Sequence, residues 1–407
     1  MIFPLVQDFA DALAAMPREH PRHRILKLLD EAIRRDVHFI DRHPTTFFQC
    51  IWNAFQLSSP VPPRYRELDQ LRVLWRERKQ GASSSFVWAR STRPPLISLG
   101  SSLRGVLTGH RAPVSAVAVA DDQRRLASAG EDMTIRIWQI EDGSCLSCLH
   151  GHLDDVTGLV FQPGGDRLYS SSLDGTIRVW DSSSQSEIAV LRGHRGPVRA
   201  VACSPDGRFL ASGAFDRSVR LWHPTSGANL GCLEGAPSPV CSLAFDAAGR
   251  RLSAGFQDGS IFVWELREAR ANANRPWWKR LFGKSQDVDL CQNWKGHAEA
   301  VNSLCFNPDG TQLISGSTDR TVRTWAGPSW SEIVPFRRFD ASVRSVAYRI
   351  SESDILVAAG YGVHRIGGSL ESRLLGRHQK EIAGLAILPA NNGFASGSHD
   401  ATVRIWG

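Results

Sequence analysis

The sequence predicts an all-β repeat domain, from about residue 96 to residue 407, that follows a small α-helical domain. Gly-His pairs recur at 109–110, 151–152, 193–194 and 296–297. The first three pairs are 42 residues apart. Short runs of alternating apolar and polar residues follow each pair, which is typical of strands in an antiparallel sheet. Residues 1–80 lack this repeat and space their apolar residues as helices do.

Each copy of the repeat predicts four strands. In the first copy, residues 113–119 (PVSAVAV) alternate as a first strand does, and residues 126–138 (LASAGEDMTIRIW) place two β-rich runs around a tight turn with Asp132. A weaker fourth run precedes the next Gly-His pair. In the fourth copy this pair has become Gly235-Ala236, and a 19-residue insertion follows within 265–295. The sixth copy is degenerate and has neither the turn Asp nor the late Trp.

A repeat of about 42 residues, with Gly-His early and Trp late, resembles the WD-repeat family. Six of the seven copies keep the Trp at the same offset, and the resemblance covers about residues 96–407. It implies a seven-bladed β-propeller in which each repeat supplies four strands. Because the ring needs every blade, the degenerate sixth copy is expected to form one too. The expected fold class is therefore an all-β seven-bladed WD-repeat propeller with a small N-terminal α-helical domain.

The resemblance also implies a buried hydrogen-bonded tetrad of His, Ser or Thr, Asp and Trp in most blades. Carried over by position, the tetrad residues are His110, Ser128, Asp132 and Trp138; His152, Ser170, Asp174 and Trp180; His194, Ser212, Asp216 and Trp222; His297, Ser315, Asp319 and Trp325; and His378, Ser396, Asp400 and Trp406. Blade four keeps Asp258 and Trp264 but has Ala236 and Ala254. Buried groups of these types must satisfy one another or cost stability.

The two ends of the repeat array are expected to meet in one blade. The last copy ends at Trp406-Gly407, which is the end of a third strand. Residues 101–110 (SSLRGVLTGH) match the fourth-strand pattern of residues 186–194 (SEIAVLRGH). We therefore expect residues of about 103–108 to complete blade seven, which removes an open sheet edge.

The N-terminal region is expected to form a helical domain over residues 1–80 and a linker over residues 81–95. Apolar residues at helical spacing form stripes, one of them from Ile25 to Ile40. Residues 34–55 (RRDVHFIDRHPTTFFQCIWNAF) weakly resemble the helical segment that precedes WD arrays in bacterial signalling NTPases.

Composition favours a cytoplasmic protein. No apolar run approaches the roughly 18 residues of a membrane span, and the N-terminus lacks the basic region of a secretory signal. Eight cysteines, mostly in strand-like runs, fit a reducing compartment better than a disulfide framework. The net charge is +7, but five of these charges belong to residues 1–95. The charge therefore does not indicate specific nucleic-acid binding.

Three patterns that mimic catalytic or metal sites have simpler explanations. Ser, His and Asp recur five times, always with Trp, so a hydrolase would need five identical buried sites. Gly283-Lys284-Ser285 resembles the end of a phosphate loop, but Trp278 stands where that loop needs glycine. Cys145 and Cys148, three residues apart on a strand, point to opposite faces, which argues against zinc. No catalytic residue, metal or cofactor is expected.

The function expected from these observations is a non-catalytic scaffold or sensor module for signalling that binds other proteins. Because the strands of a blade run antiparallel, the Gly-His loops and the Asp turns lie on the same face, which we call the top. Partner contacts are expected there, around the channel mouth. The residues chosen are Arg199, Phe215, Arg344, Tyr361, Asn302 and His399. Arginine and aromatic residues tend to dominate binding energy, although packing of Phe215 on a neighbouring blade would explain that residue equally well.

An alternative function is attachment to a polyanion or a membrane surface. The insertion contains RPWWKRLFGK at 275–284, with Trp277 and Trp278 among basic residues. Together with the basic N-terminal domain, this loop could contact a partner or an anionic surface. A loop that packs on its own propeller is the other possibility.

Overall fold

In this computed structural model, the structure is described for residues 103–233, 235–266, 288–349, 354–367, 372–388 and 393–407, and for nine isolated residues between 16 and 74. The chain divides into two compact units, Met1–Arg104 and Gly105–Gly407. In the first unit, the described residues within 23–33 and 70–74 are helical. The remainder of the predicted helical domain, the linker at 81–95 and the loop with Trp277 and Trp278 lie outside the described residues.

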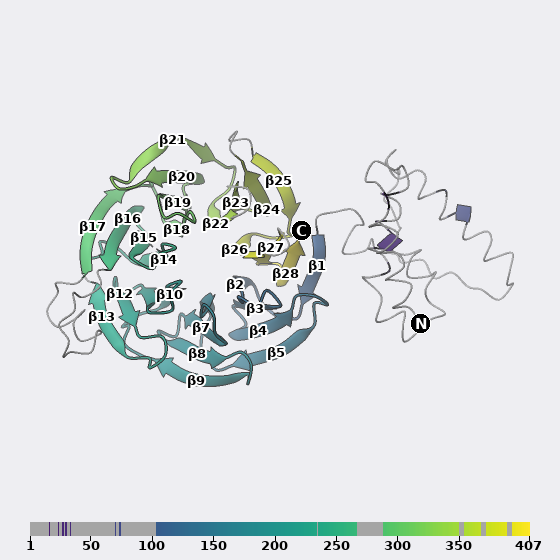
Figure 1. The fold of residues 1–407 in the computed structure, drawn as a ribbon, viewed down its shortest axis with the longest axis horizontal. Helices are drawn as coiled ribbons and strands as arrows, with labels where there is room; N and C mark the ends of the chain where they lie inside the picture. The colour runs from purple at the N-terminus through teal and green to yellow at the C-terminus, as the bar shows by residue number, and fades with distance from the viewer. Residues whose placement is uncertain are drawn as a thin grey trace. The chain divides into compact units, whose positions relative to one another are not determined.

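The strands of the described ranges form seven four-stranded antiparallel sheets, the blades of a propeller (Figure 1). Blades one to three are β2 (Val114–Val119), β3 (Arg125–Gly130), β4 (Thr134–Gln139) and β5 (Cys145–His150); β6 (Val156–Phe161), β7 (Arg167–Ser172), β8 (Ile177–Asp181) and β9 (Ser186–Leu191); and β10 (Val198–Cys203), β11 (Leu210–Ala214), β12 (Val219–Trp222) and β13 (Asn229–Leu233). Blades four to six are β14 (Val240–Phe245), β15 (Arg251–Phe256), β16 (Ser260–Leu266) and β17 (Val288–Lys295); β18 (Val301–Phe306), β19 (Gln312–Ser317), β20 (Thr321–Ala326) and β21 (Ser331–Arg338); and β22 (Val343–Arg349), β23 (Asp354–Ala359), β24 (Gly362–Ile366) and β25 (Ser372–Arg377). Blade seven is β26 (Ile382–Leu388), β27 (Gly393–Ser398), β28 (Thr402–Trp406) and β1 (Leu103–Thr108). The predicted seven-bladed propeller is therefore confirmed, with a blade at the degenerate sixth copy.

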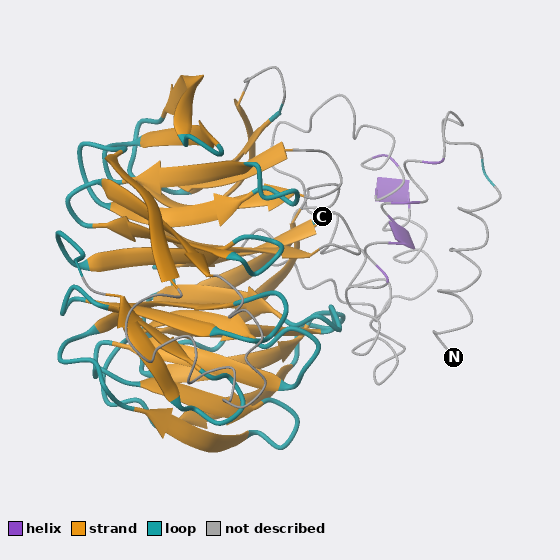
Figure 2. Cartoon of the chain, turned by 60° about the vertical axis from the view of Figure 1, so that its left-hand side comes forward, coloured by secondary structure: helices purple, strands orange, loops and turns teal. Residues whose placement is uncertain are grey.

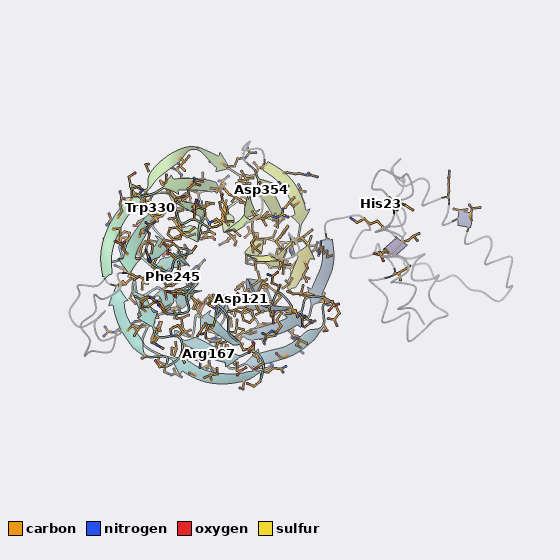
Figure 3. The ribbon with its side chains drawn as sticks, in the orientation of Figure 1. His23, Asp121, Arg167, Phe245, Trp330 and Asp354 are labelled. Carbon is orange, nitrogen blue, oxygen red and sulfur yellow. The ribbon has the colours of Figure 1, made fainter. Side chains whose placement is uncertain are left out.

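In most blades the second strand is the most buried, because neighbouring blades cover both of its faces. In β11, all five residues are buried, and they are small: Leu210 is followed by Ala, Ser, Gly and Ala. The small residues let the next blade approach closely. A Cβ atom added to Gly213 would lie only 2.4 Å from Cγ1 of Val240 on β14. Side chains fill the spaces between neighbouring blades (Figure 3).

Strand β1 closes the ring. It pairs with β28, so blade seven is built from both ends of the repeat array, and Figure 1 shows β1 beside β28. Leu107 on β1 is 3% exposed and packs in one apolar cluster with Val403 and Ile405 of β28. The outer edge of β28 is thus covered, as expected for a sheet that avoids unpaired edges.

The bottom-face loops, which join the first strand to the second and the third to the fourth, tie consecutive blades together. Figure 2 shows loops at the ends of the strands on both faces of the ring. The carboxylate of Asp121 accepts a hydrogen bond of 2.6 Å from the backbone N–H of Gly164 in blade two. The guanidinium of Arg167 donates to the carbonyls of Pro224 and Thr225 in blade three at 3.0 and 2.8 Å. Asp121 and Arg167 are both labelled in Figure 3. Among the described residues, no helix is long and apolar enough to cross a membrane.

Candidate functional site

Five blades contain the same buried chain of hydrogen bonds, and blade three illustrates it. The indole Nε1–H of Trp222 donates to the Ser212 hydroxyl at 2.8 Å, and the same oxygen lies 2.7 Å from His194 Nε2. The other ring nitrogen of His194 lies 3.1 Å from the Asp216 carboxylate. The His–Ser distance is 2.7 Å in all five blades, and the Trp–Ser distance is 2.7–2.9 Å. Each chain joins the second and third strands of a blade to the loop that enters it.

The tetrad carboxylate also fixes the top-face turn. In blade one, Asp132 accepts hydrogen bonds from the backbone N–H groups of Arg111 and Thr134 and from the Thr134 hydroxyl, at 3.0, 3.1 and 2.7 Å. Burial alone would raise the pKa of Asp132, but these hydrogen bonds and the interaction with His110 hold it below its usual value. Burial lowers the pKa of His110, against the opposing effect of Asp132. Asp132 is therefore ionised and His110 neutral near pH 7.

The serine hydroxyl of each tetrad is already occupied. With His194 neutral and its Nδ1–H donated to Asp216, the hydrogen-bond network assigns Nε2 as the acceptor of the Ser212 hydroxyl proton. The Ser212 oxygen in turn accepts from the indole, and the residue is 0% exposed. A nucleophile needs a reachable substrate, so this arrangement serves structure.

Blade four replaces the polar chain with apolar packing. Ala236 and Ala254 stand where other blades have His and Ser, and both lie in or against the apolar cluster that contains Phe262. The ring of Phe262 packs on Phe256 and on Trp264, with centroids 4.8 and 5.7 Å apart. The turn carboxylate, Asp258, accepts hydrogen bonds from the backbone N–H and the hydroxyl of Ser260, and the Ser238 side chain also bonds to Asp258.

Blade six lacks the tetrad residues, and its turn is one residue shorter than in the tetrad blades. The pairing of Ala359 with Gly362 leaves only Gly360 and Tyr361 between β23 and β24. The backbone N–H of Gly360 donates to Ser342 O, the bond that the residue before the turn Asp makes in other blades. Gly360, and not Tyr361, therefore occupies the position of the residue before the turn Asp. Tyr361 instead forms the tip of the turn and is 58% exposed.

The structure places four of the six predicted partner-binding residues in two groups. Arg344 lies 3.4 Å from the Glu381 carboxylate, and the backbone N–H of His399 donates to the Glu381 carbonyl at 2.9 Å, so both residues contact Glu381. In the other group, Phe215 is 39% exposed and Arg199 is half-buried in the same blade.

The side chain of Asn302 is hydrogen-bonded within the fold. Its side-chain amide donates to the Thr318 hydroxyl and to the Val343 carbonyl, each at 2.9 Å, and so bridges blades five and six. A partner would have to break these bonds to use it, so Asn302 is a poor candidate for partner contact.

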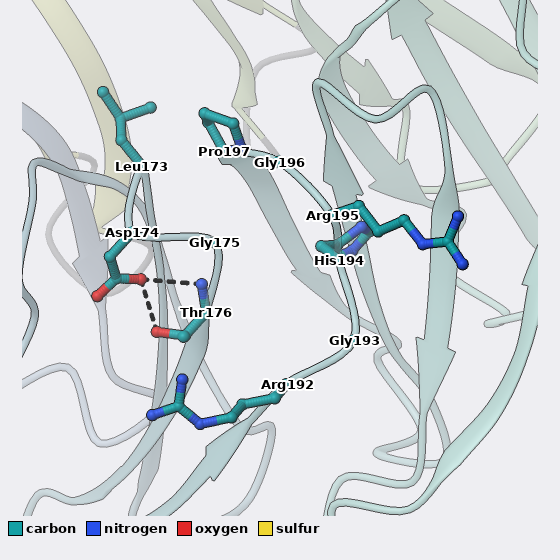
Figure 4. A pocket seen from close by; sticks show the side chains of 10 residues that line it. All are labelled: Leu173, Asp174, Gly175, Thr176, Arg192, Gly193, His194, Arg195, Gly196 and Pro197. Carbon is teal, nitrogen blue, oxygen red and sulfur yellow. Dashed lines mark hydrogen bonds between the residues drawn. The ribbon is translucent and has the colours of Figure 1, made fainter.

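A pocket between blades two and three was missed by the sequence analysis. It has a volume of about 330 Å³ and is lined by Leu173, Asp174, Gly175, Thr176, Arg192, Gly193, His194, Arg195, Gly196 and Pro197 (Figure 4). The signal in the sequence is that Arg192 and Arg195 flank the Gly-His pair, as R-G-H-R, on both sides in this copy alone. Within the described ranges, no group of three or more His, Cys, Asp or Glu side chains could hold a metal ion.

A second repeated feature was also missed. Arginine occupies the same position on the third strand in all five tetrad blades, two residues before the Trp. Arg323 bonds the Glu332 carboxylate on the fourth strand at 3.0 and 3.1 Å, and Arg178 forms an ion pair with Glu187 at the same register. These arginines join the outer strand to the blade.

The chain was compared with known protein families and with curated proteins. The family model described as WD domain, G-beta repeat matches residues 101–139, 143–181, 185–223, 227–265, 289–326 and 370–407, which is more than half of the chain.

Similar curated proteins share part of the array. The transcriptional corepressor LEUNIG_HOMOLOG of Arabidopsis thaliana is 30% identical over 115 residues, 28% of this chain and 14% of the relative. Pre-mRNA-processing factor 19 of Bos taurus is 28% identical over 131 residues, 31% of this chain and 26% of the relative. Protein Notchless of Drosophila melanogaster is 56% identical over 43 residues, 10% of this chain and 9% of the relative. The chain therefore spans about a quarter or less of the length of these relatives. With the family match over most blades and the seven-bladed ring, the chain belongs to the WD-repeat family.

Proposed function

We propose that this chain is a non-catalytic scaffold or sensor module, cytoplasmic and acting in signalling, that holds a partner protein on its top face at blade three. The observation that supports this most is Phe215. This residue is 39% exposed, although its backbone is fixed by a hydrogen bond of 2.9 Å to Pro197 O. A rigid exposed aromatic loses little conformational entropy on binding, and aromatic residues are common binding hot spots.

The tetrad explains why this turn can serve as a rigid platform. Asp216, the next residue, accepts hydrogen bonds from the backbone N–H groups of Arg195 and Ser218 at 2.8 and 3.0 Å. It is thereby linked through His194 to the blade core. Phe215 therefore projects from a turn whose geometry is set by buried bonds, and preorganisation of this kind improves affinity.

The relatives support an interaction role. They include a transcriptional corepressor, a pre-mRNA-processing factor and a ribosome biogenesis protein. Their names indicate no common reaction. The fully buried, occupied serine of each Ser-His-Asp set is a further argument for a role without catalysis.

The test is capture of the native partner by the full chain from its own cell extract. We expect Phe215→Ala combined with Arg199→Ala to abolish capture and to leave the melting temperature within a few degrees. Glu131→Ala with Gln257→Ala is the matched control, because both residues occupy the Phe215 position of other turns and both are exposed. Undiminished capture by the blade-three variant, at native stability, would refute the proposed site.

A further inference from the structure

The pocket between blades two and three opens beside Phe215. A Cβ atom at Gly175, in the blade-two turn, would lie 3.5 Å from the carbonyl oxygen of Gly196 in the loop that enters blade three. That loop contacts the Phe215 turn directly, since Pro197 O accepts the Phe215 N–H. The loop that forms one wall of the pocket is therefore bonded to the turn that carries Phe215.

Four arginines, two in the loop that enters blade three and two in blade three itself, have no partner among the described residues. Arg192, Arg195 and Arg217 are exposed and Arg199 is half-buried. Within the described part of the chain, none of the four guanidinium groups is hydrogen-bonded or within 4.0 Å of a carboxylate, unlike Arg178 in blade two, which pairs with Glu187. Figure 4 shows Arg192 extending toward Thr176, whereas Arg195 extends away from it. Their positive charge is thus presented to solvent on both sides of the loop.

The one carboxylate that lines the pocket forms its hydrogen bonds within blade two. Asp174 accepts hydrogen bonds from His152 Nδ1, from the Leu153 and Thr176 backbone N–H groups and from the Thr176 hydroxyl, at 2.6–3.1 Å. Figure 4 shows the two bonds to Thr176. Because these donors already stabilise its charge within blade two, the carboxylate is directed into the fold.

The neighbouring part of the top face has the opposite charge. Glu131 and Asp154 are exposed in blades one and two. The pKa of the nearby Asp155 is raised by burial and then by repulsion from Glu131 and Asp154. An anionic ligand should therefore be repelled by Glu131, Asp154 and Asp155 and attracted to the arginines of blade three. This asymmetry gives the ligand a defined place on the ring.

We propose that the pocket and the four arginines bind an acidic peptide segment of the partner protein, with an apolar side chain of that segment against Phe215. The proposal rests on the proposed function and specifies the chemistry of the partner. Opposite charges fix the location, the guanidinium groups bind carboxylates in bidentate geometry, and the aromatic ring supplies the apolar contact that separates a protein segment from a simple polyanion.

The test is fluorescence anisotropy of the full chain with a labelled short peptide of Glu and Asp that contains one Leu and one Phe. We expect Arg192→Gln, Arg195→Gln and Arg217→Gln together to weaken binding at least about tenfold. The control is Arg111→Gln with Arg320→Gln: Arg111 follows the tetrad His of blade one as Arg195 does in blade three, and Arg320 follows the turn Asp of blade five as Arg217 does. The control should bind the peptide like the unmodified chain. Phe215→Ala should also weaken binding, and by more than added salt weakens binding of the unmodified chain.

Three results would overturn the proposal. The control could weaken binding as much as the blade-three variant. A peptide with Gln and Asn in place of Glu and Asp could bind equally well. Dextran sulfate could displace the peptide while Phe215→Ala leaves peptide affinity unchanged, which would indicate non-specific anion binding. If native partner capture still depends on Phe215 and Arg199 in any of these cases, only the acidic-peptide proposal fails and the scaffold function stands.

Discussion

Trp222 and Ser212 are joined by a hydrogen bond of 2.8 Å from the indole Nε1 to the hydroxyl oxygen, across neighbouring strands of blade three. The bond occupies an acceptor on a hydroxyl that also meets His194. Removing one member therefore leaves the others buried without their full set of partners, and the cost of each unmade bond falls on folding stability.

His194→Ala should lower the free energy of unfolding by about 1–3 kcal/mol, the penalty for buried polar groups left unpaired. Urea unfolding at neutral pH measures this change. His150→Ala is the control, because His150 is exposed at the end of β5 and should change stability very little. Equal effects of the two substitutions would mean that the tetrad bonds do not stabilise the blade.

Stability should also decrease as the pH falls below the ordinary histidine pKa. Burial lowers the pKa of His110, His194 and His378 from 6.5 in the folded chain. The unfolded chain therefore binds protons first, and the stabilisation present above pH 6.5 is lost as the pH falls through that value. The carboxyl pKa values of Asp132 and Asp216 are lowered from 3.8, which adds a second loss below that pH. Urea unfolding should thus show lower stability at about pH 5 than at about pH 7.5; a flat or rising profile would contradict the assignment of neutral histidines.

Leu107→Ala should destabilise the ring at its closure. The side chain is buried in an apolar cluster that blade seven shares with blade one, and truncation of a buried leucine costs about 2–5 kcal/mol. Leu146→Ala is the matched control on an outer strand, since Leu146 is 43% exposed. Thermal melts of the two variants compare the effects. If both melt at the same temperature, β1 does not contribute to closing the ring.

The sequence was sufficient to predict the propeller because its signal is repeated. Six blades place the alternating strands and Trp at nearly the same offset, so even the sixth blade, which has lost the Gly-His pair and the Trp, could be expected from its neighbours. The tetrad positions could be located for the same reason. Their side chains are far apart in sequence, with Ser212 18 residues from His194, but the spacing is constant.

The features missed by sequence analysis depend on contacts between blades. The pocket beside Arg192 exists because the turn of blade two faces the loop of blade three, which no pattern within one repeat predicts. The shorter turn that contains Tyr361 could be identified only from the strand pairing in the structure. Asn302 looked available by position, and its bonds to the next blade were found only in three dimensions.

The most direct test of the central claim is hydrogen–deuterium exchange of the full chain with and without its captured partner. Partner binding on the top face of blade three should slow exchange in residues 192–199 and 213–218, because these segments form the pocket loop and the Phe215 turn. Exchange in the bottom-face loop at 204–208 of the same blade should not change. Protection confined to bottom-face loops such as 204–208, with none in 192–199 or 213–218, would contradict the account.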